Sequence, residues 1–195
     1  MPTQPIPVPL STCYRLLNHG PTVMVSSAHA GKANVMSAAW SMPLDFDPPK
    51  VAVVIDKNTL TRGLVEGSGE FVLNVPSTVL AALTVAVGSE SGRDMDKFAV
   101  HGIATLPPRK VGAPLIEGCM AWLECRLIPE PHIQQTYDLF LGEVVAAWAD
   151  PAVFDGHHWT MEEGGKRSIH YVAGGHFFET GKAIDVAQQD PVNGH

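Results

Sequence analysis

Residues 50–75 read KVAVVIDKNTLTRGLVEGSGEFVLNV, and this stretch decides the fold. Its first seven residues are mostly apolar and β-branched, which predicts a buried strand. Asn58 or Thr59 can cap a short helix over residues 60–66, and the glycines that follow end it. The last six residues form a second β-rich run. The stretch therefore predicts two strands with a short helix between them.

Similar β-rich runs recur on both sides of this stretch. Runs at 22–28 and 33–41 flank a turn and predict a hairpin. Further strands are expected at 120–128, 136–148 and 168–172, and helices at 78–87, capped by Ser77, and near 97–100. Because the strands mostly follow one another without strand–helix–strand alternation, the pattern favours a mainly β fold with inserted helices. The residues by themselves indicate an antiparallel barrel.

The run at 121–127 alternates as a strand does. Trp122, Glu124 and Arg126 share one face. Ala121, Leu123, Cys125 and Leu127 share the other face, which is apolar and is expected to face the core.

The chain has 195 residues, a mass of 20.9 kDa and a formal charge of −7, and its basic residues are scattered. This charge disfavours nucleic acid and anionic membranes as partners. No apolar run approaches the ~18 residues of a membrane span, and no secretory leader is recognised, so a cytoplasmic protein is expected. We expect an N-terminal arm at 1–12, a single domain at 13–181 and a C-terminal tail at 182–195.

Several familiar chemical motifs are absent from the sequence. There is no P-loop, no GxSxG and no HExxH. Gly88 and Gly92 follow a helical pattern, which disfavours a Rossmann dinucleotide site. The three cysteines lack CxxC spacing, and neither they nor the adjacent His157 and His158 indicate a metal site.

Two segments have residue types that suit a planar, phosphorylated ligand. In the run 34–40, small residues such as Ser37 and Ala38 let a flat ring lie close to backbone amides. The segment 56–62 supplies hydroxyls, a lysine, an arginine and the start of a helix, which suit a phosphate. On these residues alone, a plain hairpin followed by a capped helix remains the alternative.

The sequence resembles the flavin reductase-like proteins with an FMN-binding split barrel, of the flavoredoxin and ferric-reductase type. The resemblance covers roughly residues 13 to 178 and depends on the order and spacing of several short motifs. These are the run 34–40, Asp47-Pro-Pro49, Thr61 with Leu64 and Val65, and the segments 69–75, 92–98, 113–115, 123–125 and 141–144.

The resemblance implies a six-stranded antiparallel Greek-key split β-barrel that forms a homodimer with bound FMN. It implies that NAD(P)H passes a hydride to the flavin, which then reduces a small-molecule acceptor, for which we favour a diffusible flavin. The flavin carries the redox chemistry, so no catalytic side chain is expected. The alternatives are an FMN-binding electron carrier without nicotinamide turnover and a split barrel that holds another flat cofactor, such as pyridoxal phosphate or haem.

The resemblance also implies which residues bind the cofactor. Those expected at the ring and the ribityl chain are Asn34, Val35, Met36, Ser37 and Ala38. Those expected around the phosphate are Asp56, Lys57, Asn58 and Thr61, with Arg62 beside them and Lys97 approaching from a later segment. The segments 130–135 and 150–167 match no motif of the family.

Overall fold

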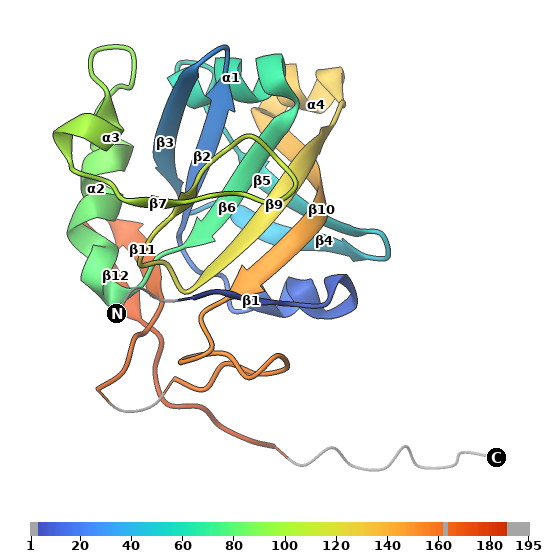
Figure 1. The fold of residues 1–195 in the computed structure, drawn as a ribbon, viewed down its shortest axis with the longest axis vertical. Helices are drawn as coiled ribbons and strands as arrows, with labels where there is room; N and C mark the ends of the chain where they lie inside the picture. The colour runs from blue at the N-terminus through green and yellow to red at the C-terminus, as the bar shows by residue number, and fades with distance from the viewer. Residues whose placement is uncertain (1–3, 162–163, 187–195) are drawn as a thin grey trace.

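The computed structural model describes residues 4–161 and 164–186, in which an antiparallel sheet curves into an open barrel (Figure 1). Its strands hydrogen-bond in the order β3-β2-β6-β9-β10-β5-β4, and β1 pairs with the end of β10. Their bounds are β1 Ile6–Pro7, β2 Val23–His29, β3 Lys32–Ala38, β4 Ser41–Phe46, β5 Pro49–Val54, β6 Glu70–Val75, β9 Ala121–Ile128 and β10 Leu139–Ala149.

The mainly β split barrel expected from the sequence is confirmed, with two strands more than the expected six. One extra strand is β1, which the N-terminal arm adds to β10. The other is β4, which pairs with β5 although its sequence contains a proline and an aspartate. Both additions are edge strands, and such residues are tolerated at an edge because one side of the backbone stays unpaired there.

Helices lie at both ends of the barrel and along β3, as Figure 1 shows. They are η1 Leu10–Leu16, α1 Leu60–Ser68, η2 Thr78–Leu80, α2 Ala81–Ser89, α3 Lys97–Val100 and α4 Pro131–Tyr137. Thr59 caps α1 by accepting a hydrogen bond from the Arg62 N–H, and Gly69 ends it at φ 71°. Ser77 precedes the 3-10 turn η2 and not α2, and it makes no side-chain cap bond.

The strand expected at 136–148 begins later, at Leu139. The residues before it form α4, which starts with Pro131 in its first turn and ends at Asp138 with φ 55°. Proline is favourable in a first helical turn, where its missing N–H needs no partner. The sequence reading extended the β pattern too far because Thr136 and Tyr137 have high strand propensity.

Apolar side chains fill both faces of the sheet. One core cluster occupies the barrel interior around Phe71 and Leu123, and a second lies outside it around Trp122. The apolar face of β9 lies in the first cluster as expected. Much of the opposite face is buried as well, since Trp122 and Glu124 are both 0% exposed, whereas Arg126 is exposed.

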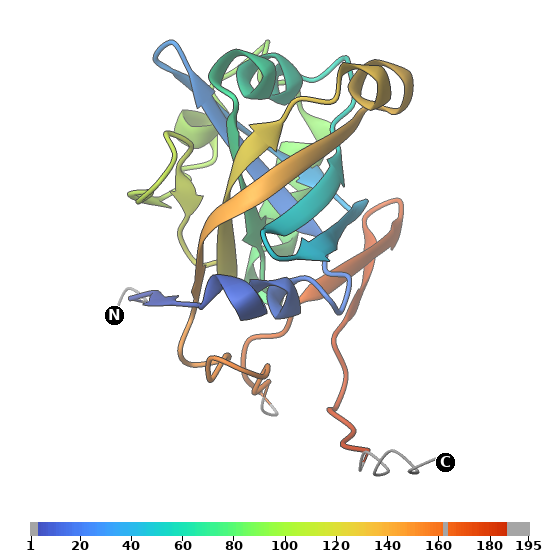
Figure 2. The same cartoon turned by 90° about the vertical axis from the view of Figure 1, so that its right-hand side faces the viewer.

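A separate hairpin of β11 Ile169–Ala173 and β12 His176–Glu179 projects beside the barrel (Figure 2). Its base is tied to the loop before β2: the Thr22 N–H donates to the Ile169 carbonyl at 2.8 Å, and the Tyr171 N–H donates to Thr22 Oγ1 at 2.8 Å. His170 Nδ1 hydrogen-bonds to the Gly20 carbonyl at 3.0 Å. A small sheet of β7 Thr105–Leu106 and β8 Leu115–Ile116 completes the fold. Most of the expected C-terminal tail, 187–195, lies outside the described residues.

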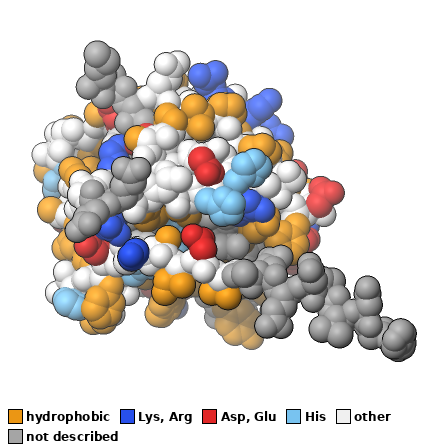
Figure 3. All heavy atoms as spheres, turned by 90° about the horizontal axis from the view of Figure 1, so that it is seen from below, with side chains coloured by type: hydrophobic (Ala, Val, Ile, Leu, Met, Phe, Trp, Pro, Cys, Tyr) orange, Lys and Arg blue, Asp and Glu red, His pale blue; other side chains and the backbone are white. Residues whose placement is uncertain are grey.

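The surface has no single dominant character on the face seen in Figure 3, where acidic, basic, histidine and apolar side chains are interspersed. Among the described residues, no helix is long and apolar enough to cross a membrane. In the same part of the chain, no group of three or more His, Cys, Asp or Glu side chains is placed to hold a metal ion.

Candidate functional site

A cavity of about 220 Å³, here called the edge cavity, lies between β3, the start of α1, and the end of α2 with the segment that follows it. β3 ends the sheet path, so one side of its backbone is open to this region. The lining residues are Asn34, Met36, Ser37, Asn58, Thr59, Leu60, Val87, Gly88, Ser89, Glu90, Ser91, Gly92 and Lys97. Three segments distant in the sequence therefore meet at one polar hollow.

Lys97 is the main source of positive charge in this cavity, although its side chain is only 3% exposed. Its ammonium donates to the carbonyl oxygens of Val35 at 2.9 Å and Val87 at 2.6 Å. An ammonium has three donors, and within the described residues the third has no acceptor and no carboxylate pairs with it. Burial lowers the pKa of Lys97, and the charge of Glu90 opposes that shift. The cavity therefore has a cation that an anionic ligand would complement.

The first turn of α1 adds backbone donors at the same place. Thr59 and Leu60 line the cavity at the N-terminal end of this nine-residue helix, where unpaired N–H groups favour an anion. Thr61, in the same helical turn, is fully buried, and its hydroxyl accepts a hydrogen bond from Asn34 Nδ2 at 2.9 Å. Thr61 thus fixes the amide of Asn34, which lines the cavity.

Two glycines, one in the last turn of α2 and one in the segment that follows it, let this part of the chain approach β3 closely. A Cβ on Gly88 would lie 2.0 Å from Ser37 Oγ, and a Cβ on Gly92 would lie 2.1 Å from Asn34 Oδ1. Any larger residue at either position would displace a side chain that lines the cavity.

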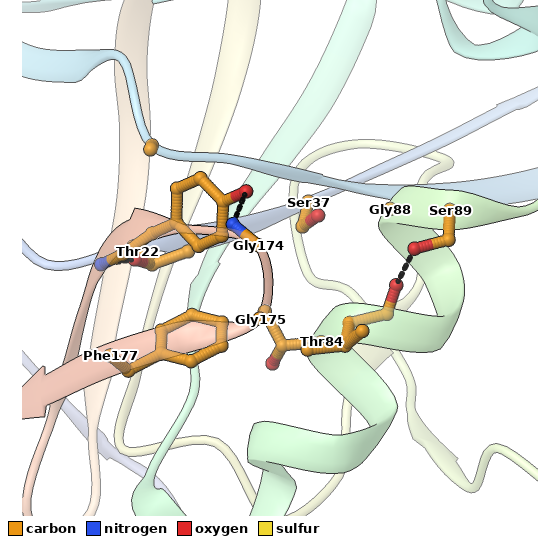
Figure 4. A pocket seen from close by; sticks show the side chains of 11 residues that line it. Thr22, Ser37, Thr84, Gly88, Ser89, Gly174, Gly175 and Phe177 are labelled. Atoms are coloured by element: carbon orange, nitrogen blue, oxygen red, sulfur yellow. Dashed lines mark hydrogen bonds between the residues drawn. The ribbon is translucent and has the colours of Figure 1, made fainter.

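A second cavity of about 490 Å³, the hairpin cavity, adjoins the first and shares Ser37, Gly88 and Ser89 with it. Figure 4 shows α2 on one side and the β11–β12 hairpin, with Phe177, on the other. Its lining residues are Thr22, Ser37, Ala39, Thr84, Val85, Gly88, Ser89, Tyr171, Gly174, Gly175 and Phe177. The two cavities together form a groove along β3, with the cation at one end and aromatic rings at the other.

The structure brings five of the sequence-predicted residues together at the edge cavity: Asn34, Met36, Ser37, Asn58 and Lys97. Val35 and Ala38 point into the two core clusters instead. Asp56 shapes the loop before α1, with its Oδ1 accepting from the Asn58 N–H at 2.7 Å. Lys57 is exposed and does not line the cavity.

Arg62 lies beside the edge cavity but does not line it, and its side chain forms its contacts with residues outside the cavity. Its guanidinium pairs with Glu66 at 3.0 Å and with Asp138, and donates to the Gln134 carbonyl at 2.9 Å. It also lies over the ring of Phe140, 5.3 Å from its centroid. These contacts attach α1 to α4 and β10.

Sequence reasoning missed the segment 88–92, which lines the edge cavity along much of its length. Gly88 and Gly92 were weighed as a Rossmann pair, and Gly92 also began the family motif 92–98, but neither glycine was expected to line the site. The two glycines flank the polar residues 89–91, and this pattern could have indicated the site. Close approach of the backbone to a strand or a ligand favours glycine. The hairpin residues Tyr171 and Phe177 had no such signal, because only the tertiary fold brings them to β3.

A split barrel with a polar, cationic groove along its edge strand defines the class of protein, and comparison with known proteins gives its family. The family model described as "Flavin reductase like domain" matches residues 15–169. The Escherichia coli (strain K12) protein YddH is 44% identical over 182 residues, which cover 92% of this chain and 96% of YddH.

Solved structures agree with that match. The FMN-binding domain of a flavin reductases-like enzyme from Shewanella baltica OS155 is 46% identical, with a TM-score of 0.93 over 96% of this chain and 100% of that one. Flavoredoxin of Desulfovibrio vulgaris (Miyazaki F) shares the fold at 23% identity and a TM-score of 0.76, over 86% of this chain and 90% of that one. The chain belongs to the flavin reductase-like family.

Proposed function

We propose that this protein binds FMN in the groove along β3, and that NAD(P)H reduces the bound flavin, which then reduces a small acceptor. The observation that carries the proposal is the buried ammonium of Lys97, which borders the edge cavity without a carboxylate partner among the described residues. A phosphate beside it would supply the missing negative charge. The relative from Shewanella baltica, described as FMN-binding, supports the choice of cofactor.

The sizes of the two cavities support an extended ligand. The edge cavity, at about 220 Å³, is smaller than the ~300–1,000 Å³ typical of sites that hold a whole cofactor. We assign the phosphate and ribityl chain to this cavity, near Lys97, Asn34 and the start of α1. The ring then extends toward the larger hairpin cavity, past Ser37.

FMN, when bound, supplies the capacity to accept a hydride and pass on its electrons. The protein's own residues bind and orient it. Lys97 and the first amides of α1 hold the anionic end, and Asn34 is held in place by Thr61. The small side chain of Ser37 leaves the backbone of β3 accessible to the polar edge of a flat ring. Backbone donors there would stabilise the negative charge that the ring gains on reduction.

Absorbance spectroscopy tests this proposal directly. The purified protein is expected to be yellow, or to retain a yellow colour after incubation with FMN and removal of unbound FMN by gel filtration, and anaerobic NADH or NADPH is expected to bleach the flavin band. A stable yellow solution with both nucleotides would indicate an electron carrier without nicotinamide turnover. A protein that is colourless after incubation with FMN and removal of the unbound flavin would contradict the proposal, and a pyridoxal or haem spectrum would identify another cofactor.

We further propose that the protein is a homodimer. β4 and the residue before it form an edge of the sheet that exposes four large apolar side chains: Trp40, Met42, Leu44 and Phe46. Trp40 is 75% exposed and Phe46 66%. An apolar edge strand of this kind invites pairing with a second copy. Sedimentation at micromolar concentration should give about twice 20.9 kDa, and a mass near 20.9 kDa would contradict the dimer.

Thr61→Val is expected to weaken FMN binding by about 1–3 kcal/mol, the cost of leaving a buried polar partner unpaired. The hydroxyl of Thr61 holds the Asn34 amide, so the effect acts through Asn34. FMN titration monitored by flavin fluorescence measures the change. Thr136→Val, at an exposed position of α4, is the matched control and should leave the dissociation constant unchanged. Equal affinities for the two variants would place the phosphate elsewhere.

A further inference from the structure

The hairpin cavity has two chemically different walls. On the side of β3 and α2 it presents the hydroxyl groups of Ser37, Thr84 and Ser89 (Figure 4). The Thr84 hydroxyl donates to the carbonyl of Leu80, at the end of η2, at 2.9 Å, and that of Ser89 donates to the Val85 carbonyl at 2.8 Å. On the other side the hairpin presents the rings of Tyr171 and Phe177. A flat molecule in this cavity would therefore have an aromatic surface on one side.

The two rings pack on each other and belong to neither core cluster. Their centroids lie 5.3 Å apart at an interplanar angle of 64°. Tyr171 is 46% exposed, and Phe177 is half-buried. Aromatic rings that fill no core and face a cavity are suited to contact a ligand ring.

Tyr171 also offers a hydrogen-bond donor. Its hydroxyl oxygen accepts from the Gly174 N–H at 3.0 Å, which fixes the position of that oxygen at the tip of the hairpin. The hydroxyl proton has no acceptor among the described residues, so it is available to an oxygen or nitrogen at the edge of a ligand ring.

We propose that the β11–β12 hairpin forms the acceptor site, in which Phe177 packs against a planar conjugated ring and Tyr171 donates a hydrogen bond to a polar atom on its edge. This inference rests on the proposed function, because it places the acceptor against the ring of bound FMN. It assigns specificity for planar carbonyl-bearing rings, such as a quinone, over compact metal chelates, which gain nothing from an aromatic wall.

The electron balance for a quinone is simple. The quinone gains two electrons and two protons and becomes a hydroquinone, and the reduced flavin supplies both electrons and both protons as it returns to the oxidised form. The reductant is therefore already part of the proposed function. Because this half-reaction starts from reduced flavin, it can be measured whether or not NAD(P)H is the natural donor.

The test uses FMN-loaded protein, photoreduced without oxygen and mixed with a naphthoquinone or with ferric citrate. The rate of flavin reoxidation, measured against acceptor concentration, gives an apparent dissociation constant for each acceptor. Phe177→Ala is expected to raise that constant about tenfold for the naphthoquinone and to leave the ferric citrate rate within twofold. Tyr171→Phe removes only the hydroxyl donor. It is expected to lower the second-order rate constant for reoxidation by the naphthoquinone about threefold to tenfold.

Phe178→Ala is the matched control. Phe178 is the next residue on β12, is 62% exposed, and does not line the cavity; its ring packs on His176. Equal effects of the Phe177 and Phe178 variants would overturn the proposal, as would equal losses with both acceptors. A Phe177 variant that loses FMN affinity but keeps the naphthoquinone constant would assign the hairpin to the cofactor instead and also overturn it. Failure of the wild-type protein to bind FMN would instead show that the proposed function itself is wrong.

Discussion

Replacing Lys97 with methionine is expected to weaken FMN binding roughly 10- to 100-fold. Hydrogen bonds to a charged group contribute about 1.5–3 kcal/mol, and each 1.4 kcal/mol is a factor of ten in affinity. Methionine has a similar length and is apolar, so it fits the buried position of Lys97 while removing the charge. Quenching of flavin fluorescence during titration gives the dissociation constant, and thermal unfolding of the apo protein reports any loss of stability.

Lys57→Met is the matched control, because Lys57 is exposed and lies outside the edge cavity. This variant is expected to bind FMN like the wild type. The pair also distinguishes the two lysines that the family resemblance implied, Lys57 at the phosphate and Lys97 approaching it from a later segment. Similar losses in both variants would mean that general positive charge, and not the ammonium of Lys97, attracts the cofactor.

The affinity for FMN should also depend on pH in the alkaline range. Burial lowers the pKa of Lys97 from its ordinary value of 10.5. Below the pKa of the free protein the ammonium is charged and the affinity is full. Above that pKa, binding requires the uptake of a proton, so the affinity falls as the pH rises. The Lys97→Met variant should lack this decline. If the affinity of the wild-type protein for FMN stays unchanged up to pH 10.5, the result would contradict the role of Lys97.

The strand and the helix that flank the site could be predicted from the sequence, because the signals for them act between residues close together in the chain. The apolar run ending at Ile55, the cap at Thr59 and the glycine at position 69 each act within a few residues, and all appear in the structure. The groove itself depends on contacts between residues that are far apart in the sequence. Lys97 reaches carbonyls at positions 35 and 87, and no pattern in the sequence shows that these three positions meet.

Arg62 and β9 show the other limit of sequence reasoning. An arginine at the start of a helix suits a phosphate, but Arg62 turns toward Asp138 because α4, which the sequence did not predict, brings that carboxylate near. On β9, alternation correctly placed the apolar face in the core. It gave no indication that the face with Glu124 is buried too, because a second layer of chain from β7 and β8 covers it.

Glu124→Gln is expected to destabilise the protein by about 2–4 kcal/mol. The carboxylate is 0% exposed and accepts from the N–H groups of Arg109, Lys110 and Val111 and from the indole N–H of Trp148. An amide replaces one accepting oxygen with two donors, which would face other donors, and each buried donor left unpaired costs roughly 1–3 kcal/mol. Thermal unfolding should show a fall in Tm of roughly 5–15 °C, since 1 kcal/mol shifts a domain of this size by about 2–4 °C.

Glu143→Gln makes the same chemical change at an exposed position on the neighbouring strand β10, and it should alter stability by no more than about 0.5 kcal/mol. The Glu124 variant should retain the wild-type affinity for FMN when it is folded, because Glu124 lies in neither cavity. The segment 109–111 depends on one carboxylate for three of its backbone donors, so the loss should appear as earlier unfolding and not as weaker cofactor binding. Equal Tm values for the two glutamine variants would show that the amide can satisfy these donors and that the negative charge is dispensable.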